Sequence, residues 1–153
     1  MHNSENKTLR PRSGFTLVEL LAVLTILTIL VAMAVGVGNY IMDKSKKITT
    51  QEVQALVLRS IDAYQTVAGA YPADSTDTAS LVSALKGQRL SKEIFDRIPA
   101  DSLDSTAAKI IDGYGNAMKY VSNGGAGNAP VLISAGKDGN FDTLDDNIRS
   151  DGR

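Results

Sequence analysis

Residues 12–38, RSGFTLVELLAVLTILTILVAMAVGVG, form one long apolar run directly after a short polar start. From residue 15 to residue 37 the run is interrupted only by Thr16, Glu19, Thr25, Thr28 and Gly36. As a helix it would extend about 35 Å, which exceeds the roughly 30 Å hydrocarbon core of a bilayer. A helix that is apolar on every side is typical of a membrane span, because the rest of the chain is too small to wrap it. We therefore predict a transmembrane helix.

The composition argues against several functional classes. The 153 residues carry a net charge of −1, which is too small to indicate a nucleic-acid partner. There is no cysteine for a disulfide or for thiol chemistry, and the single histidine is His2. The sequence also lacks a Ser/His/Asp set, a histidine metal site and a phosphate-binding loop. We expect neither an enzyme nor a nucleic-acid-binding protein.

The start of the chain, residues 1–14, is polar and contains three basic residues against one acidic residue. A positive flank favours a cytoplasmic location for this end of a membrane helix. Lys44, Lys46 and Lys47 follow the apolar run, however, so charge alone leaves the orientation open. No small-residue cleavage site of a secretory signal follows the run.

Residues 14–19, Gly-Phe-Thr-Leu-Val-Glu, lie between this basic leader and the apolar run. They resemble the processing motif of type IV pilins and type II secretion pseudopilins. The resemblance implies that a prepilin peptidase cuts between Gly14 and Phe15 and methylates the new amino terminus of Phe15. It also implies that Glu19 pairs with the Phe15 amine of a neighbouring subunit during assembly. Such a pair sets the register, because only one axial stagger satisfies both buried charges.

Glu19 needs an explanation, since a carboxylate inside a membrane helix costs about 2.5–3.5 kcal/mol on insertion scales. The new α-amine of Phe15 would be mostly cationic and would lie one turn away. It could therefore pair with Glu19 of its own chain as well as with that of a neighbour. The remaining alternative is a glutamate that reaches the membrane surface without a partner.

Helical spacing continues from residue 39 to residue 70. The apolar residues there form one stripe, at three- and four-residue intervals: Val53, Leu56, Val57, Ile61, Tyr64, Val67 and Ala68. We expect Tyr71-Pro72 to end the helix, because proline disfavours helical geometry in the preceding residue. Gly36 and Gly38 stand where pilins commonly carry a proline. We expect them to soften the helix locally, since each costs about 1 kcal/mol relative to alanine.

The remaining sequence predicts two short helices, at 77–86 and 91–98, and then strands at 109–111, 118–122 and 131–134. The predicted fold class is therefore α+β and pilin-like, with a long N-terminal helix packed on a small antiparallel sheet. The expected divisions are a cleaved leader, a transmembrane and polymerisation half of the helix, and a periplasmic globular domain: residues 1–14, 15–38 and 39–153.

Three further segments resemble the major pseudopilin of type II secretion. They are the Tyr71-Pro72 helix end, the turn at 112–116 (DGYGN) and the start of the C-terminal loop at 134–139 (SAGKDG). The absence of cysteine also fits a pseudopilin better than a type IV pilus subunit, whose C-terminal loop is usually closed by a disulfide.

The C-terminal loop at residues 138–148, DGNFDTLDDNI, is rich in carboxylates. Oxygen ligands at short intervals suit Ca²⁺. An EF-hand is excluded, because its required glycine and its bidentate glutamate are missing. The major pseudopilin binds one calcium ion in this loop, and the resemblance implies Asp138, Asp145 and Asp146 as ligands, with Asp142 as a further candidate. The alternative is a solvated acidic turn.

The resemblance implies a structural subunit of a type II secretion pseudopilus. The chain would cross the inner membrane once, with its N-terminus cytoplasmic and its C-terminal domain periplasmic. It would polymerise with copies of itself and with minor pseudopilins on an inner-membrane assembly platform, and the periplasmic fibre would help to drive protein secretion. A type IV pilus or DNA-uptake pilin shares every N-terminal feature. A monomeric membrane-anchored binding module is a third possibility, and it would keep its leader.

Overall fold

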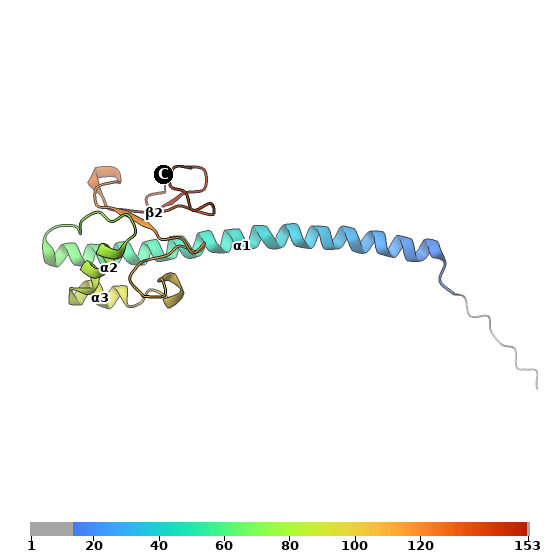
Figure 1. The fold of residues 1–153 in the computed structure, drawn as a ribbon, viewed down its shortest axis with the longest axis horizontal. Helices are drawn as coiled ribbons and strands as arrows, with labels where there is room; N and C mark the ends of the chain where they lie inside the picture. The colour runs from blue at the N-terminus through green and yellow to red at the C-terminus, as the bar shows by residue number, and fades with distance from the viewer. Residues whose placement is uncertain (1–13, 153) are drawn as a thin grey trace, which may run out of the picture. The chain divides into compact units, whose positions relative to one another are not determined.

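A computed structural model describes residues 14–152, so the predicted leader lies outside the described residues except for Gly14. The longest element is helix α1 (Leu17–Ala68), drawn from blue to green in Figure 1. The chain divides into two units, Met1–Tyr40 and Ile41–Arg153, and α1 contributes to both.

Helix α1 ends two residues before the predicted stop. Gly69 has a φ of +77°, and its N–H donates to the Gln65 carbonyl oxygen at 2.8 Å. A positive φ is a common way to close a helix, and it favours glycine because glycine has no Cβ. The helix therefore ends at Ala68, before Tyr71-Pro72 is reached. Residues 36 and 38 are both helical, so softening at these glycines stays a prediction.

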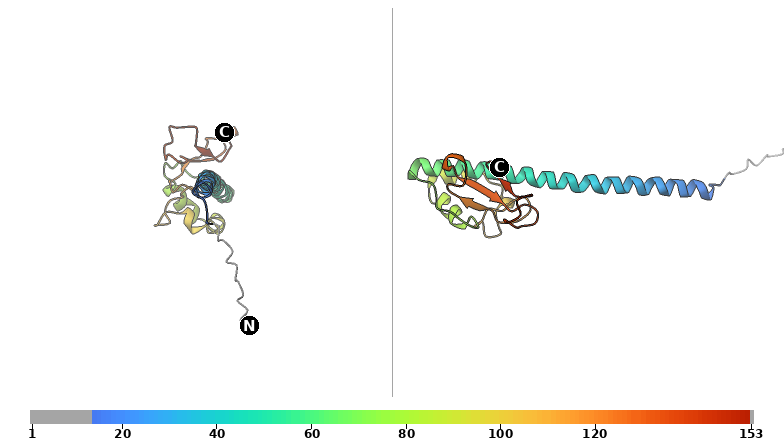
Figure 2. Two further views of the ribbon diagram at one scale, coloured as in Figure 1. Left: turned by 90° about the vertical axis from the view of Figure 1, so that its right-hand side faces the viewer. Right: turned by 90° about the horizontal axis from the view of Figure 1, so that it is seen from above.

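The core of the second unit forms on one face of α1. Val53, Val57 and Ile61 are buried there. They share one hydrophobic cluster with residues of helix α2 (Ala79–Lys86), helix α3 (Arg89–Phe95), the sheet and the connecting segments: Leu81, Val82, Leu85, Phe95, Ile98, Ile110, Met118, Tyr120 and Leu132. Figure 2 (left) views α1 end on, with the sheet and the short helices beside it. The predicted stripe is wrong at its end, because Val67 and Ala68 are exposed, with 57% of Val67 accessible.

The sheet has three antiparallel strands in the order β1-β2-β3, namely β1 (Lys119–Val121), β2 (Val131–Ser134) and β3 (Ile148–Arg149). Two short 3₁₀ helices, Ala100–Ser102 and Ala126–Asn128, precede β1 and β2 respectively. The long helix with a small antiparallel sheet packed on it confirms the predicted α+β class.

One predicted strand is absent from the structure, and one observed strand was not predicted. The segment 109–111 forms only isolated bridges, Leu103↔Ile110 and Ile111↔Ala117, and is not a strand. Strand β3 was not predicted, because two residues at the end of an acidic loop show no alternating pattern. Its place is set by pairing with β2, with Ser134 opposite Ile148.

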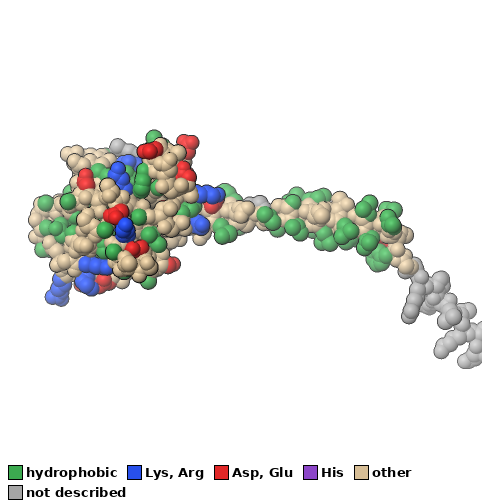
Figure 3. Space-filling model, viewed as in Figure 1, with side chains coloured by type: hydrophobic (Ala, Val, Ile, Leu, Met, Phe, Trp, Pro, Cys, Tyr) green, Lys and Arg blue, Asp and Glu red, His purple; other side chains and the backbone are tan. Residues whose placement is uncertain are grey.

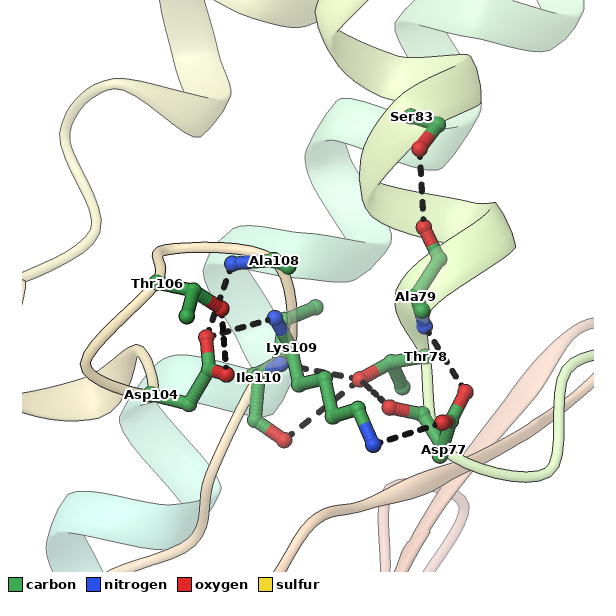
Figure 4. Close-up of polar contacts among 9 residues, drawn as sticks. All are labelled: Asp77, Thr78, Ala79, Ser83, Asp104, Thr106, Ala108, Lys109 and Ile110. Atoms are coloured by element: carbon green, nitrogen blue, oxygen red, sulfur yellow. Dashed lines mark hydrogen bonds and ion pairs between the residues drawn. The ribbon is translucent and has the colours of Figure 1, made fainter.

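A polar network joins the start of α2 to the segment before β1 (Figure 4). Asp77 accepts a hydrogen bond from the Ala79 N–H at 3.1 Å and pairs with Lys109 Nζ at 2.8 Å. Buried Thr78 accepts from the Ile110 N–H at 2.9 Å. The N-cap residue of α2 is Thr78, so Asp77 lies one residue before the cap, where it accepts from the first N–H of the helix. Through Lys109 it also ties together two segments about thirty residues apart.

Three polar residues of α1 are also buried, and the apolar stripe alone did not reveal them: Thr50, Gln54 and Ser60. Gln54 Nε2 donates to the carbonyl oxygens of Ile148 at 2.8 Å and Leu132 at 3.2 Å. Ser60 Oγ donates to the Ser91 carbonyl oxygen at 2.7 Å. These bonds tie α1 to β2, to β3 and to α3.

Candidate functional site

The start of α1 is a capping box between Thr16 and Glu19. Oε2 of Glu19 accepts from the Thr16 N–H at 2.9 Å and from Thr16 Oγ1 at 3.0 Å. The Glu19 N–H donates back to Thr16 Oγ1 at 3.2 Å. These bonds satisfy backbone donors that would otherwise be unpaired at a helix N-terminus. Gly14 and Phe15 precede the helix, and Phe15 is 84% exposed.

The capping box explains in part how the Glu19 carboxylate is tolerated in a membrane helix. Both bonds from Thr16 reach Oε2, and among residues 14–152 Oε1 of Glu19 has no partner. The carboxylate is therefore half satisfied within its own chain and can still accept from an outside donor. Thr16 was missed as a functional residue, although the Thr-x-x-Glu spacing of a capping box was visible in the sequence.

The other polar side chains of the apolar run bond to the helix itself. Thr25 Oγ1 donates to the Leu21 carbonyl oxygen and Thr28 Oγ1 to that of Thr25, both at 2.8 Å. Neither hydroxyl therefore needs water, and this makes both residues compatible with hydrocarbon.

The apolar side chains of α1 from Leu17 to Met42 are exposed. Figure 3 shows hydrophobic side chains along this stretch. By length and composition alone, α1 is the one helix among the described residues that can cross a membrane. An apolar surface this long needs lipid or other apolar helices around it.

The C-terminal acidic loop is held by hydrogen bonds of its own. Oδ2 of Asp146 accepts from the backbone N–H groups of Lys137 at 2.8 Å and Asp138 at 3.1 Å. Asp138 accepts from Thr143 Oγ1 at 2.5 Å and from the Asn140 N–H at 2.8 Å. The Thr143 hydroxyl, followed by this N–H, lowers the pKa of Asp138 below its ordinary value.

The predicted calcium ligands are not gathered into a formed site. Asp142 and Asp145 are exposed, and Asp138 and Asp146 are engaged as described above. Among residues 14–152 no three His, Cys, Asp or Glu side chains lie close enough to hold a metal ion together. The oxygen-rich composition suits Ca²⁺, but this arrangement does not fit it, so calcium binding stays a prediction.

Buried Asp112 connects the start of the acidic loop to the turn at 112–116. Its Oδ2 accepts from Ser134 Oγ at 2.5 Å, and its Oδ1 accepts from the N–H groups of Tyr114 and Asn116, both at 2.9 Å. Asn116 Nδ2 then donates to the Gly136 carbonyl oxygen at 2.9 Å. These hydrogen bonds hold the start of the acidic loop, just after β2, against the turn at 112–116.

Residues 9–35 match the family model described as the prokaryotic N-terminal methylation motif. This chain therefore carries a prokaryotic N-terminal methylation motif at the start of its apolar run. No curated protein and no solved structure matches it.

The methylation motif covers the predicted cleavage site and the first part of the apolar run. It implies processing by a prepilin peptidase and polymerisation of the pilus type. Pilin-like proteins are generally structural subunits and not enzymes. The N-terminal apolar helix is consistent with a pilin anchored in a membrane. The assignment of Gly14, Phe15 and Glu19 to cleavage, methylation and assembly stays a prediction.

Proposed function

We propose that this pilin-like protein is the structural subunit of a type II secretion pseudopilus. The observation that carries the proposal is the half-satisfied carboxylate of Glu19 at the start of an exposed apolar helix. The same helix continues into a packed globular unit. A subunit of this kind can bury its apolar helices in the centre of a polymer and present its folded unit outside.

The proposed assembly follows from the chemistry of the N-terminus. Cleavage after Gly14 would create a cationic amine at Phe15, next to Thr16 of the capping box. Because Oε1 of Glu19 has no partner among the described residues, it can accept from the Phe15 amine of a neighbouring subunit. The capping box would limit the cost of an ionised Glu19 in the membrane before that partner arrives.

The methylation motif alone does not distinguish a secretion pseudopilus from other fibres of the pilus type. The choice of the pseudopilus rests on the absence of cysteine and on the resemblance of the 112–116 turn and the C-terminal loop to the major pseudopilin. The proposal includes the inner-membrane location before assembly, the minor pseudopilins, the assembly platform and a structural calcium ion. A type IV pilus or DNA-uptake pilin is the second candidate, favoured by the observation that the acidic loop holds no three converging acidic groups.

The assembly step is tested with Glu19→Gln and Glu19→Leu. Glutamine keeps an amide oxygen that can accept from Thr16, so it preserves the capping box and removes the charge. Leucine removes both. If the charge pair sets the register, both variants lose the sheared fibre fraction to a similar extent, while both remain processed and in the membrane. Full fibre yield from Glu19→Gln would overturn the register role and leave only a capping role.

The cellular role is tested by deleting the gene in the native host and restoring it on a plasmid. Loss of secreted proteins from the medium, without loss of surface fibres or DNA uptake, supports the pseudopilus. Loss of surface fibres or of DNA uptake with intact secretion identifies the second candidate. An uncleaved leader and no fibre of any kind would indicate a monomeric anchored module instead.

A further inference from the structure

Three lysines follow the exposed apolar stretch of α1, and the proposed function gives them no role. Ile41 and Met42 are the last exposed apolar residues of that stretch. Lys44, Lys46 and Lys47, called the lysine cluster below, follow on the same helix. Figure 3 shows Lys and Arg side chains gathered where this stretch ends. Lysines are depleted on the translocated side of membrane helices, so their presence here calls for a partner.

The described residues do not neutralise the lysine cluster. The acidic residue within it, Asp43, pairs with Lys137 Nζ at 3.2 Å. Among residues 14–152 no acidic side chain forms an ion pair with the cluster. Lys46 Nζ lies 5.4 Å from the Tyr114 ring centroid, and this contact leaves its charge in place. The other two lysines are exposed.

The position of the cluster along α1 matches the depth of phospholipid headgroups. Tyr40 is 68% exposed, and tyrosine is typical of the boundary between hydrocarbon and headgroups. At about 1.5 Å per residue, the cluster lies roughly 6 to 10 Å beyond Tyr40 along the helix axis. The headgroup layer on each side of a bilayer is about 5–8 Å deep. Flexible lysine stems can bring the ammonium groups back to its phosphates.

We propose that the lysine cluster binds the phosphates of anionic phospholipids in the leaflet where α1 leaves the membrane. The inference rests on the membrane-anchored state in the proposed function. Charge complementarity selects this occupant, since the cluster is compact, cationic and directly adjacent to a surface that needs hydrocarbon. Bound lipid would hold the subunit at one depth before assembly, and these contacts would be released when the helix enters the fibre.

The test uses the full chain in vesicles of phosphatidylcholine with or without phosphatidylglycerol. Because the chain has no cysteine, a single Ser45→Cys carries a donor fluorophore beside the cluster. Energy transfer to acceptor-labelled phosphatidylglycerol or phosphatidylcholine then reports which lipid is enriched around it. The double variant Lys44→Gln/Lys47→Gln is compared with Arg89→Gln/Arg97→Gln, which removes the same charge from exposed positions in and just after α3.

We expect phosphatidylglycerol to be enriched around the probe in the parent and in the arginine control. In the lysine variant the enrichment should fall several-fold, toward the level of phosphatidylcholine, and high salt should weaken it in the parent. Equal enrichment in all three proteins would overturn the proposal. The proposal would also be overturned if the energy transfer rose with protein density and was lost in Asp142→Asn/Asp145→Asn. The lysine cluster would then bind the acidic loop of a second copy and not lipid.

Alkaline carbonate extraction separates this inference from the proposed function. A chain that stays in the membrane but enriches no phosphatidylglycerol overturns the lipid site and leaves membrane anchoring in place. A chain that is extracted overturns the anchoring, and the lipid site with it.

Discussion

Gly113 lies directly against the backbone of Lys46 on α1. A Cβ on Gly113 would stand 2.3 Å from the Lys46 carbonyl oxygen and 2.9 Å from its Cα. The Gly113 N–H donates to Thr50 Oγ1 at 2.9 Å, and that hydroxyl donates to the same Lys46 carbonyl at 2.8 Å. The turn at 112–116, which anchors the acidic loop, is therefore docked on α1 where a side chain would prevent contact.

Gly113→Ala should consequently destabilise the globular unit. The nearest atoms are backbone and cannot swing aside, so the turn must move, and we expect a loss of about 1–3 kcal/mol in the free energy of unfolding. Urea unfolding of the full chain in detergent, followed by circular dichroism, measures it. Gly38→Ala is the control, since a Cβ there meets nothing within 4 Å. Equal stability of the two variants would contradict the docking.

Gln54 supports a second prediction, because it is 1% exposed and its Nε2 bridges two carbonyl oxygens of the sheet. Gln54→Met keeps the volume but removes both donors, and we expect it to cost about 1–3 kcal/mol. Gln54→Glu should be worse at neutral pH, because an ionised carboxylate would face those two oxygens.

The two Gln54 variants should differ in their pH dependence. Burial would raise the pKa of the new glutamate, so Gln54→Glu should regain stability as the pH falls through that raised value toward about 4.3. Gln54→Met should show no such recovery relative to the parent. Thermal unfolding between about pH 4 and pH 8 tests this, and parallel curves for the two variants would count against the bridging role.

The Asp77–Lys109 pair of Figure 4 predicts a third effect. The Lys109 side chain, followed by the Ala79 N–H, lowers the pKa of Asp77, and Asp77 raises that of Lys109. A lowered carboxyl pKa contributes stability that is lost as the pH falls below about 4, and a raised lysine pKa contributes stability that is lost above about 10. The pair therefore acts between these limits.

NMR titration of Asp77 tests this pair directly. Lys109→Met should return the pKa of Asp77 toward its ordinary value. Lys92→Met, which removes the half-exposed partner of Asp96, should leave the pKa of Asp77 unchanged. If the pKa of Asp77 moved equally in both variants, Lys109 would not be the residue that lowers it. The effect on overall stability should be small, since both side chains are about two-fifths exposed.

Sequence patterns predicted the elements that depend on local signals. The apolar run, the helix that Gly87 ends and the strand at 131–134 all follow from residue periodicity and turn residues. Strand β3 and the buried role of Gln54 depend instead on contacts between distant segments, which no local pattern encodes. The acidic loop shows the same limit, because its composition suggested converging ligands while its aspartates bond to nearby backbone.

The calcium proposal makes a fourth prediction. Binding requires the acidic loop to rearrange, because no three acidic side chains converge among residues 14–152. We still expect millimolar Ca²⁺ to raise the unfolding temperature of the chelator-treated full chain. An ion that binds only the native state adds about 2.7 kcal/mol at one hundred times its Kd.

Two variants with the same charge change decide whether the shift comes from the loop. Asp145→Asn should abolish it, whereas Asp62→Asn, on the open face of α1, should preserve it. No shift in the parent would contradict the calcium proposal, and an equal shift in both variants would assign the effect to another site. Either result would favour the pilus-type candidate over the major pseudopilin.

The capping box between Thr16 and Glu19 supports the last prediction. Thr16→Val removes the hydroxyl that donates to Oε2 and accepts from the Glu19 N–H, and it retains only the backbone bond. Loss of an N-cap costs about 1 kcal/mol of helix stability, and here it also leaves a carboxylate less satisfied at membrane depth. We expect less Thr16→Val subunit in the carbonate-resistant membrane fraction, and Thr16→Ser, which keeps the hydroxyl, should match the parent. If valine and serine behave alike, the hydroxyl has no role in holding Glu19 before assembly. Suppose that Thr16→Val alone is depleted from the membrane fraction, while Glu19→Gln inserts normally but forms no fibre. The capping bonds would then be needed for membrane insertion of the monomer, and the charge of Glu19 for polymerisation.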